Sequence, residues 1–132
     1  MGESTPRRAS ANSRMGARFE SIAAKYYENL GYKILARNWR SGRLEIDLVI
    51  SRGTRVRFVE VKGGKTDLMG HPAYRVDSRK REKLIRAAQA FLQTRNEESA
   101  DSQWDYAFEA LIIMRTITGI VIERFEDAFG VT

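Results

Sequence analysis

Apolar side chains recur along this 132-residue chain with helical spacing in two segments. The first predicts a helix over residues 16–30, which ends at Gly31. The second predicts an amphipathic helix over 79–94, with Ser78 as its N-cap. Segments rich in β-branched and aromatic residues predict strands. These strands are expected over 32–39, 44–50, 55–62, 104–114 and 117–124.

The predicted order is helix, three strands, helix, two strands. The third strand, the second helix and the fourth strand form a crossover unit, which should be right-handed and make those two strands parallel. We therefore expect an α/β domain over residues 15–132, with helices on the faces of a central mixed sheet. Residues 1–14, MGESTPRRASANSR, have no apolar core, so we expect a disordered basic tail and no secretory signal.

The composition excludes several classes of chemistry. The chain has no cysteine, which removes disulfides, thiolate metal sites and a cysteine nucleophile. This composition fits a reducing compartment, so a cytoplasmic location is predicted. No segment approaches the roughly 18–20 apolar residues of a membrane span, so no membrane is expected. A serine relay could rest only on the single histidine, His71, and phosphate-binding glycine loops and dinucleotide fingerprints are missing.

Charge is distributed unevenly along the chain. The formal net charge is +6, but residues 1–96 hold 21 Lys and Arg against 9 Asp and Glu, and residues 97–132 hold 2 against 8. A basic segment of this kind predicts a polyanion partner, although a solubilising surface explains the charge equally well. Candidate phosphate contacts are Arg40 and Arg43 in a turn, and Arg79, Lys80, Arg81, Lys83 and Arg86 at the start of the second helix.

Acidic residues stand at fixed offsets in the two strands that flank the turn Ser51-Arg52-Gly53-Thr54. Side chains alternate between faces along a strand, so Glu45 and Asp47 share one face, as do Glu60 and Lys62. With the middle two residues of the turn as the loop, Glu45 faces Glu60 and Asp47 is its diagonal neighbour. Carboxylates this close repel each other unless a cation lies between them, so the pattern predicts a metal site.

The residue types suit phosphodiester hydrolysis. Carboxylates such as Asp47 and Glu60 bind hard cations, here Mg²⁺ or Mn²⁺, and Lys62 could orient a water or neutralise a phosphoryl transition state. Strands with one wet face also carry Glu and Lys for solubility, and the Asp…Glu-x-Lys pattern alone favours that explanation. The shared face and the basic surroundings favour the metal site.

Three runs of sequence resemble the bacterial YraN-like family, a predicted endonuclease group of the PD-(D/E)XK nuclease-like superfamily. They are Gly-Tyr-Lys-Ile-Leu-Ala-Arg-Asn-Trp-Arg at 31–40, Glu-Ile-Asp-Leu-Val at 45–49 and Phe-Val-Glu-Val-Lys at 58–62. The resemblance covers about residues 16–114. It implies a restriction-endonuclease-like αβββαββ fold, a three-layer domain with a central mixed sheet.

The resemblance also implies roles for single residues. Asp47 and Glu60 match the metal-binding acids, Lys62 matches the catalytic lysine, and Glu20 matches a first-helix glutamate that completes such metal sites. Glu45 matches a glutamate without a settled role, either a metal contact or a carboxylate that supports the ligands by hydrogen bonding. The family pattern is broken at three places, by Leu44 where glycine is expected, by Ile46 in place of the superfamily's proline, and by Gly63-Gly64 after the lysine.

These observations predict a metal-dependent endonuclease that acts on DNA, favoured over RNA and with a preference for branched structures. The alternative is a non-catalytic module that binds nucleic acid or a protein partner on the same scaffold. A homodimer is compatible with the resemblance, because junction-cutting relatives are dimers, but no interface can be identified in the sequence.

Overall fold

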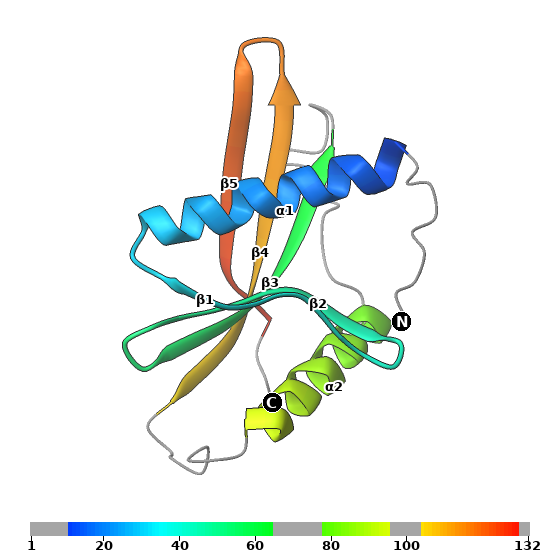
Figure 1. The fold of residues 1–132 in the computed structure, drawn as a ribbon, viewed down its shortest axis with the longest axis vertical. Coiled ribbons are helices and arrows are strands. Elements are labelled where there is room, and N and C mark those ends of the chain that lie inside the picture. Colours follow the sequence, from blue (N-terminus) through cyan, green and yellow to red (C-terminus); the bar gives the residue numbers. More distant parts are fainter. Residues whose placement is uncertain (1–10, 65–77, 96–103, 130–132) are drawn as a thin grey trace, which may run out of the picture.

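The computed structural model describes residues 11–64, 78–95 and 104–129 (Figure 1). Its elements are α1 (Ala11–Asn29), β1 (Lys33–Ser41), β2 (Leu44–Arg52), β3 (Arg55–Gly64), α2 (Ser78–Arg95), β4 (Asp105–Thr116) and β5 (Gly119–Phe129). The strands form one sheet in the order β1-β2-β3-β4-β5. β3 and β4 pair in parallel and the other neighbours pair antiparallel, so the predicted crossover through α2 is confirmed.

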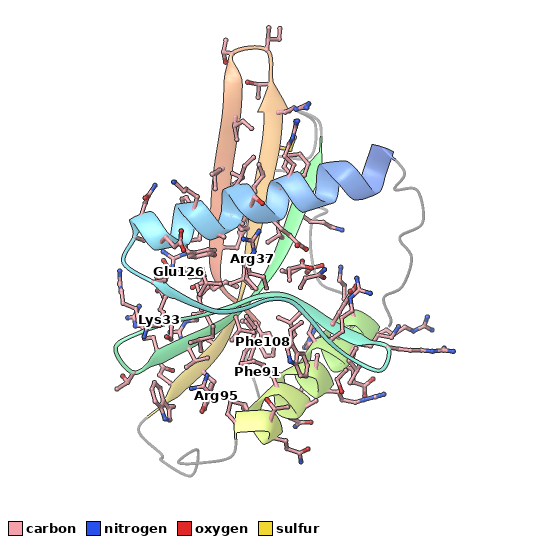
Figure 2. All side chains as sticks on the ribbon, in the orientation of Figure 1. Lys33, Arg37, Phe91, Arg95, Phe108 and Glu126 are labelled. Atoms are coloured by element: carbon pink, nitrogen blue, oxygen red, sulfur yellow. The ribbon has the colours of Figure 1, made fainter. Side chains whose placement is uncertain are left out.

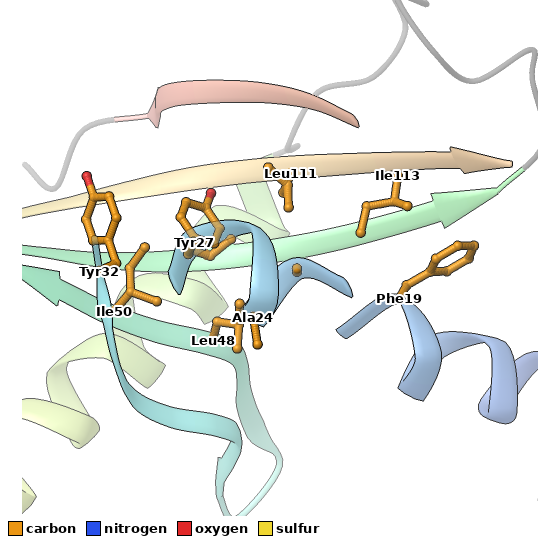
Figure 3. Packing of buried hydrophobic residues seen from close by; sticks show 10 residues of the cluster. Phe19, Ala24, Tyr27, Tyr32, Leu48, Ile50, Leu111 and Ile113 are labelled. Carbon is orange, nitrogen blue, oxygen red and sulfur yellow. The ribbon is translucent and has the colours of Figure 1, made fainter. Parts of the chain in front are cut away.

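The two helices cover opposite faces of this sheet, which gives three layers (Figure 1). A core cluster that includes Ala23 and Tyr27 joins α1 to one face (Figure 3). A second cluster that includes Ala88 and Phe91 joins α2 to the other face. The arrangement is the restriction-endonuclease-like αβββαββ fold that the sequence predicted. Neither helix of the described ranges has a stretch apolar and long enough to cross a membrane.

Some element boundaries differ from the prediction. α1 begins at Ala11, so residues 11–14 of the expected tail are helical, and residues 1–10 lie outside the described part of the chain. The strand expected over 55–62 was predicted to end too early, because Gly63 and Gly64 also pair with β4 inside β3. Leu30, the last residue of the helix expected over 16–30, lies beyond the end of α1 and is exposed, whereas Tyr27 is fully buried. His71 lies outside the described residues.

A buried carboxylate links α1 to the C-terminal half of the sheet. Glu109 of β4 is 2% exposed and accepts a 2.8 Å hydrogen bond from the Tyr27 hydroxyl. Arg124 of β5 donates to both carboxylate oxygens, from Nε at 3.0 Å and from Nη2 at 2.9 Å. The Arg57 Nε lies 3.7 Å from the same group. Burying this charge is tolerated because the cations and the hydroxyl replace its hydration.

We expect Arg124→Met to lower the free energy of unfolding by roughly 3 kcal/mol, the low end for breaking a buried ion pair, because Tyr27 and Arg57 still contact Glu109. Urea denaturation would measure the change. Arg115→Met, at an exposed arginine of β4, is the matched control and should change stability by less than about 0.5 kcal/mol. Equal stability of the two variants would contradict a structural role for the Glu109 network.

Candidate functional site

The hairpin between β2 and β3 has a different register from the one expected. Arg52 pairs with Arg55, so the two-residue loop is Gly53-Thr54 and not Arg52-Gly53. Gly53 has φ +63°, a left-handed conformation that glycine adopts without steric cost at the first loop position. The loop lies one residue further along the chain, so each β2 residue pairs two positions further along β3, and the predicted pairing of Glu45 with Glu60 is wrong.

The sheet opens where β2 leaves β3. β2 pairs with β1 along its whole length but with β3 only from Arg52 to Leu48, whose partner is Val59. β3 continues along β4 to Gly64. Asp47 and Glu60 are the first residues beyond the last pair on their two strands, so they lie at the point of divergence. Asp47 Oδ2 accepts a 2.8 Å hydrogen bond from the Val61 N–H, which satisfies that donor where the ladder has stopped.

Asp47 lies in an environment that disfavours its charge. Burial raises the pKa of its carboxyl group, and the nearby carboxylates of Glu60 and Glu45 act in the same direction. The hydrogen bond from the Val61 N–H and the ammonium group of Lys80 oppose that rise. Acids from two strands are therefore close enough to repel each other, as the sequence predicted.

Glu20 reaches the same neighbourhood from α1. Burial and the Asp47 carboxylate raise the pKa of Glu20, and a hydrogen bond between the two carboxyl groups acts in the same direction. Local packing explains how α1 comes so close to the sheet. A Cβ atom at Gly63 would lie 1.9 Å from the Phe19 ring, so this close contact requires a glycine. Gly63, which lies beyond the strand expected over 55–62, therefore allows Phe19 and its neighbour Glu20 to pack against β3.

Two residues of β1 at the site were not identified from the sequence. The Arg37 side chain lies beside α1 (Figure 2) and donates a 3.0 Å hydrogen bond to the Ser21 hydroxyl. Its charge lowers the pKa of Glu20. Asn38, between the pairs Arg37–Leu48 and Trp39–Ile46, lies level with Asp47 and has φ +50°. Asparagine tolerates this left-handed conformation better than most residues. Both residues belong to the run 31–40, whose family resemblance was the one available signal.

The remaining predicted site residues lie on the same strands. Lys62 follows Glu60 by two positions in β3 and is half-buried. Glu45 is exposed and pairs with Arg40 across β1 and β2, with Arg40 Nε 3.4 Å from Glu45 Oε1. An exposed ion pair of this kind contributes about 0–1 kcal/mol. Glu45 is therefore an exposed partner of Arg40 that adds negative charge near Asp47 and Glu20.

The predicted phosphate contacts lie on the β1–β2 hairpin and on α2, and their exposed members are called the basic surface below. Arg43 lies in the β1–β2 turn, and Leu44 beside it packs against the apolar cluster to which α2 contributes Ala87, Ala88 and Phe91. The exposed cations of this surface are Arg40, Arg43, Arg79, Arg81, Lys83 and Arg86. Lys80 is less exposed than these residues, and its ammonium group forms an ion pair with the Glu60 carboxylate, one of the acids of the site.

Within the described ranges, no three Asp, Glu or His side chains form a group that could hold a metal ion by themselves. The predicted metal ligands Glu20, Asp47 and Glu60 thus lie near one another but do not form a complete ligand set for a metal ion. Magnesium commonly takes only one or two protein carboxylates and completes its shell with water and substrate oxygens. Asp47 and Glu60 meet that requirement in residue type.

Comparison with known proteins assigns the chain to one family, by a family model and by individual relatives alike. A family model described as "Uncharacterised protein family UPF0102" matches residues 19–121, which include every predicted site residue. A UPF0102 protein of Chloroherpeton thalassium is 36% identical over 118 residues, 89% of this chain and 90% of the relative. One from Chlorobium chlorochromatii is 38% identical over 119 residues, 89% and 92% of the two chains. Neither name states an activity.

We expect Gly63→Ala to destabilise the fold by about 1–3 kcal/mol, because the added methyl group would overlap the Phe19 ring. Urea denaturation of a double-mutant cycle tests this explanation. In a Phe19→Ala background, the same glycine substitution should cost much less, since the ring is gone. An equal cost in both backgrounds would show that the glycine is needed for another reason.

We expect Asp47→Asn to raise stability at neutral pH, by about 0.5–2 kcal/mol, the usual range for a stabilising substitution. Because the native pKa of Asp47 is raised above its ordinary value of 3.8, the folded protein retains a proton that the unfolded chain has lost. Stability contributed by that proton is present below pH 3.8 and is lost as the pH rises through the native pKa. The amide keeps an acceptor for the Val61 N–H.

Thermal unfolding of both proteins between pH 3 and pH 8 would measure the difference, which should shrink toward the acid end. Glu28→Gln, at an exposed carboxylate of α1, is the control and should change the profile little. A variant less stable than the parent at neutral pH would contradict the inferred charge repulsion around Asp47.

Proposed function

The chain belongs to the UPF0102 family, the YraN family that its motifs resembled, and from the geometry of its site we propose that it is a metal-dependent endonuclease acting on DNA. The observation that carries the proposal is the meeting of Glu20, Asp47 and Glu60 where β2 and β3 diverge. Three elements bring these acids together at a cost in charge repulsion. Such clusters are concentrated at functional sites.

The donor set fits a hard divalent cation. Asp47 and Glu60 would hold Mg²⁺ or Mn²⁺, and Glu20 would support the ion or its water. When bound, the ion would supply positive charge to a phosphoryl transition state. In its absence, burial and repulsion among the carboxylates disfavour their ionised forms, and both raise the pKa values of Asp47 and Glu20.

The chain's own residues have separable tasks in this proposal. Lys62, two positions beyond Glu60 on β3, would orient the attacking water or neutralise charge on the scissile phosphate. Arg37 would hold Glu20 in place, because it binds the neighbouring Ser21 and offsets the glutamate's charge. Phosphodiester hydrolysis with an activated water needs no covalent nucleophile from the protein.

The basic surface supports a nucleic acid as the substrate. Arg43 in the β1–β2 turn and cations of α2 such as Arg79 and Lys83 are exposed, and they belong to the same elements that carry Asp47 and Lys80 or to elements packed against them. Contacts of this type bind phosphates with little base specificity and with strong dependence on salt. We propose DNA in preference to RNA, a preference for branched DNA, action in the cytoplasm, and a homodimer when both strands are cut.

The experiment that tests the proposal is cleavage of labelled linear, flapped and four-way-junction DNA, with Mn²⁺ or with EDTA. We expect cleavage in Mn²⁺ that falls at least about 100-fold in Asp47→Asn and in Glu60→Gln, the range for losing one group that stabilises the transition state. Glu28→Gln, an exposed carboxylate on the same helix as Glu20, should cut normally. DNA binding without cleavage, unchanged by metal or by either variant, would replace the enzyme with a non-catalytic binding module.

A further inference from the structure

Lys80 stands apart from the other cations at the start of α2. Its side chain is 43% exposed and its ammonium group pairs with a Glu60 carboxylate whose own side chain is only 11% exposed. Arg79, Arg81 and Lys83 are exposed. The sequence grouped all of them as phosphate contacts, but the fold brings Lys80 to the acidic site.

The charge of Lys80 acts on both predicted metal ligands. It pairs directly with Glu60, and it also lowers the pKa of Asp47 against the burial that raises it. The ammonium group therefore offsets part of the repulsion where β2 and β3 diverge. A divalent cation bound by the same two carboxylates would perform the same task with twice the charge.

We propose that Lys80 is a built-in counter-ion that competes with the divalent metal for Glu60. The inference rests on the proposed metal site but goes beyond it, because it gives α2 a part in controlling the affinity of that site. An ammonium group and a metal ion cannot contact the same carboxylate oxygen at full strength, because the two cations repel each other. Metal binding must therefore weaken the Lys80–Glu60 ion pair, and removal of Lys80 must strengthen metal binding.

Calorimetric titration of Mn²⁺ into the full-length protein without DNA tests this competition. Lys80→Gln should bind Mn²⁺ about tenfold more tightly than the parent, a change of the size expected for a neighbouring unit charge at a partly exposed site. Lys83→Gln, which removes an exposed lysine one turn along α2, should stay within about twofold. Lys80→Arg keeps the positive charge and should bind close to the parental affinity.

Circular dichroism checks the fold of each variant, and Lys80→Met replaces Lys80→Gln if the latter is unfolded. Suppose the parent binds Mn²⁺ and Glu60→Gln does not, so that the metal site stands. Unchanged or weaker Mn²⁺ binding by folded Lys80→Gln would then overturn the counter-ion role alone. A parent protein that binds no Mn²⁺ would overturn the proposed metal site, and the competition with it. Equal gains in the Lys80 and Lys83 variants would point to general surface charge and would also overturn the specific role.

Discussion

The site depends on the parting of β2 from β3 after Leu48 and Val59. A strand that ends its pairing early leaves backbone donors without partners, and an unsatisfied buried donor costs about 1–3 kcal/mol. The Asp47 carboxylate removes that cost for Val61 by accepting its N–H. The same side chain thus stabilises the opening of the sheet and lies at the centre of the acidic cluster.

The two helices bring opposite charges to this opening. α1 carries Glu20 and is held against the sheet by the Tyr27–Glu109 hydrogen bond and by the contact of Phe19 with Gly63. α2 packs on the other face through its own apolar cluster and carries Lys80 to Glu60. Because each helix is anchored by its own apolar cluster, the positions of Glu20 and Lys80 are set by core packing away from the site. The fold can therefore tolerate repulsion that the site residues alone could not offset.

Much of the architecture followed from local patterns. We could predict the crossover and the mixed sheet from the helical spacing of apolar residues, the helix stop at Gly31 and the order of the elements. Element ends were less well determined, because α1 starts at Ala11 and β3 runs through two glycines. Glycine has no intrinsic preference for a strand, so only pairing with β4 and the approach of Phe19 could place Gly63 inside one.

The sequence by itself determined which residues carry the candidate chemistry: Asp47, Glu60 and Lys62 on neighbouring strands, with Glu20 added by family resemblance. Tertiary structure alone decided how they meet. A loop at Gly53-Thr54, one residue later than predicted, moves every cross-strand partner by two residues and separates Glu45 from Glu60. Helix packing brings Glu20 and Lys80 from opposite faces. The physical reason is that strand periodicity fixes neighbours along a strand, whereas register and helix docking are set by turn conformation and core packing, which bring distant parts of the chain together.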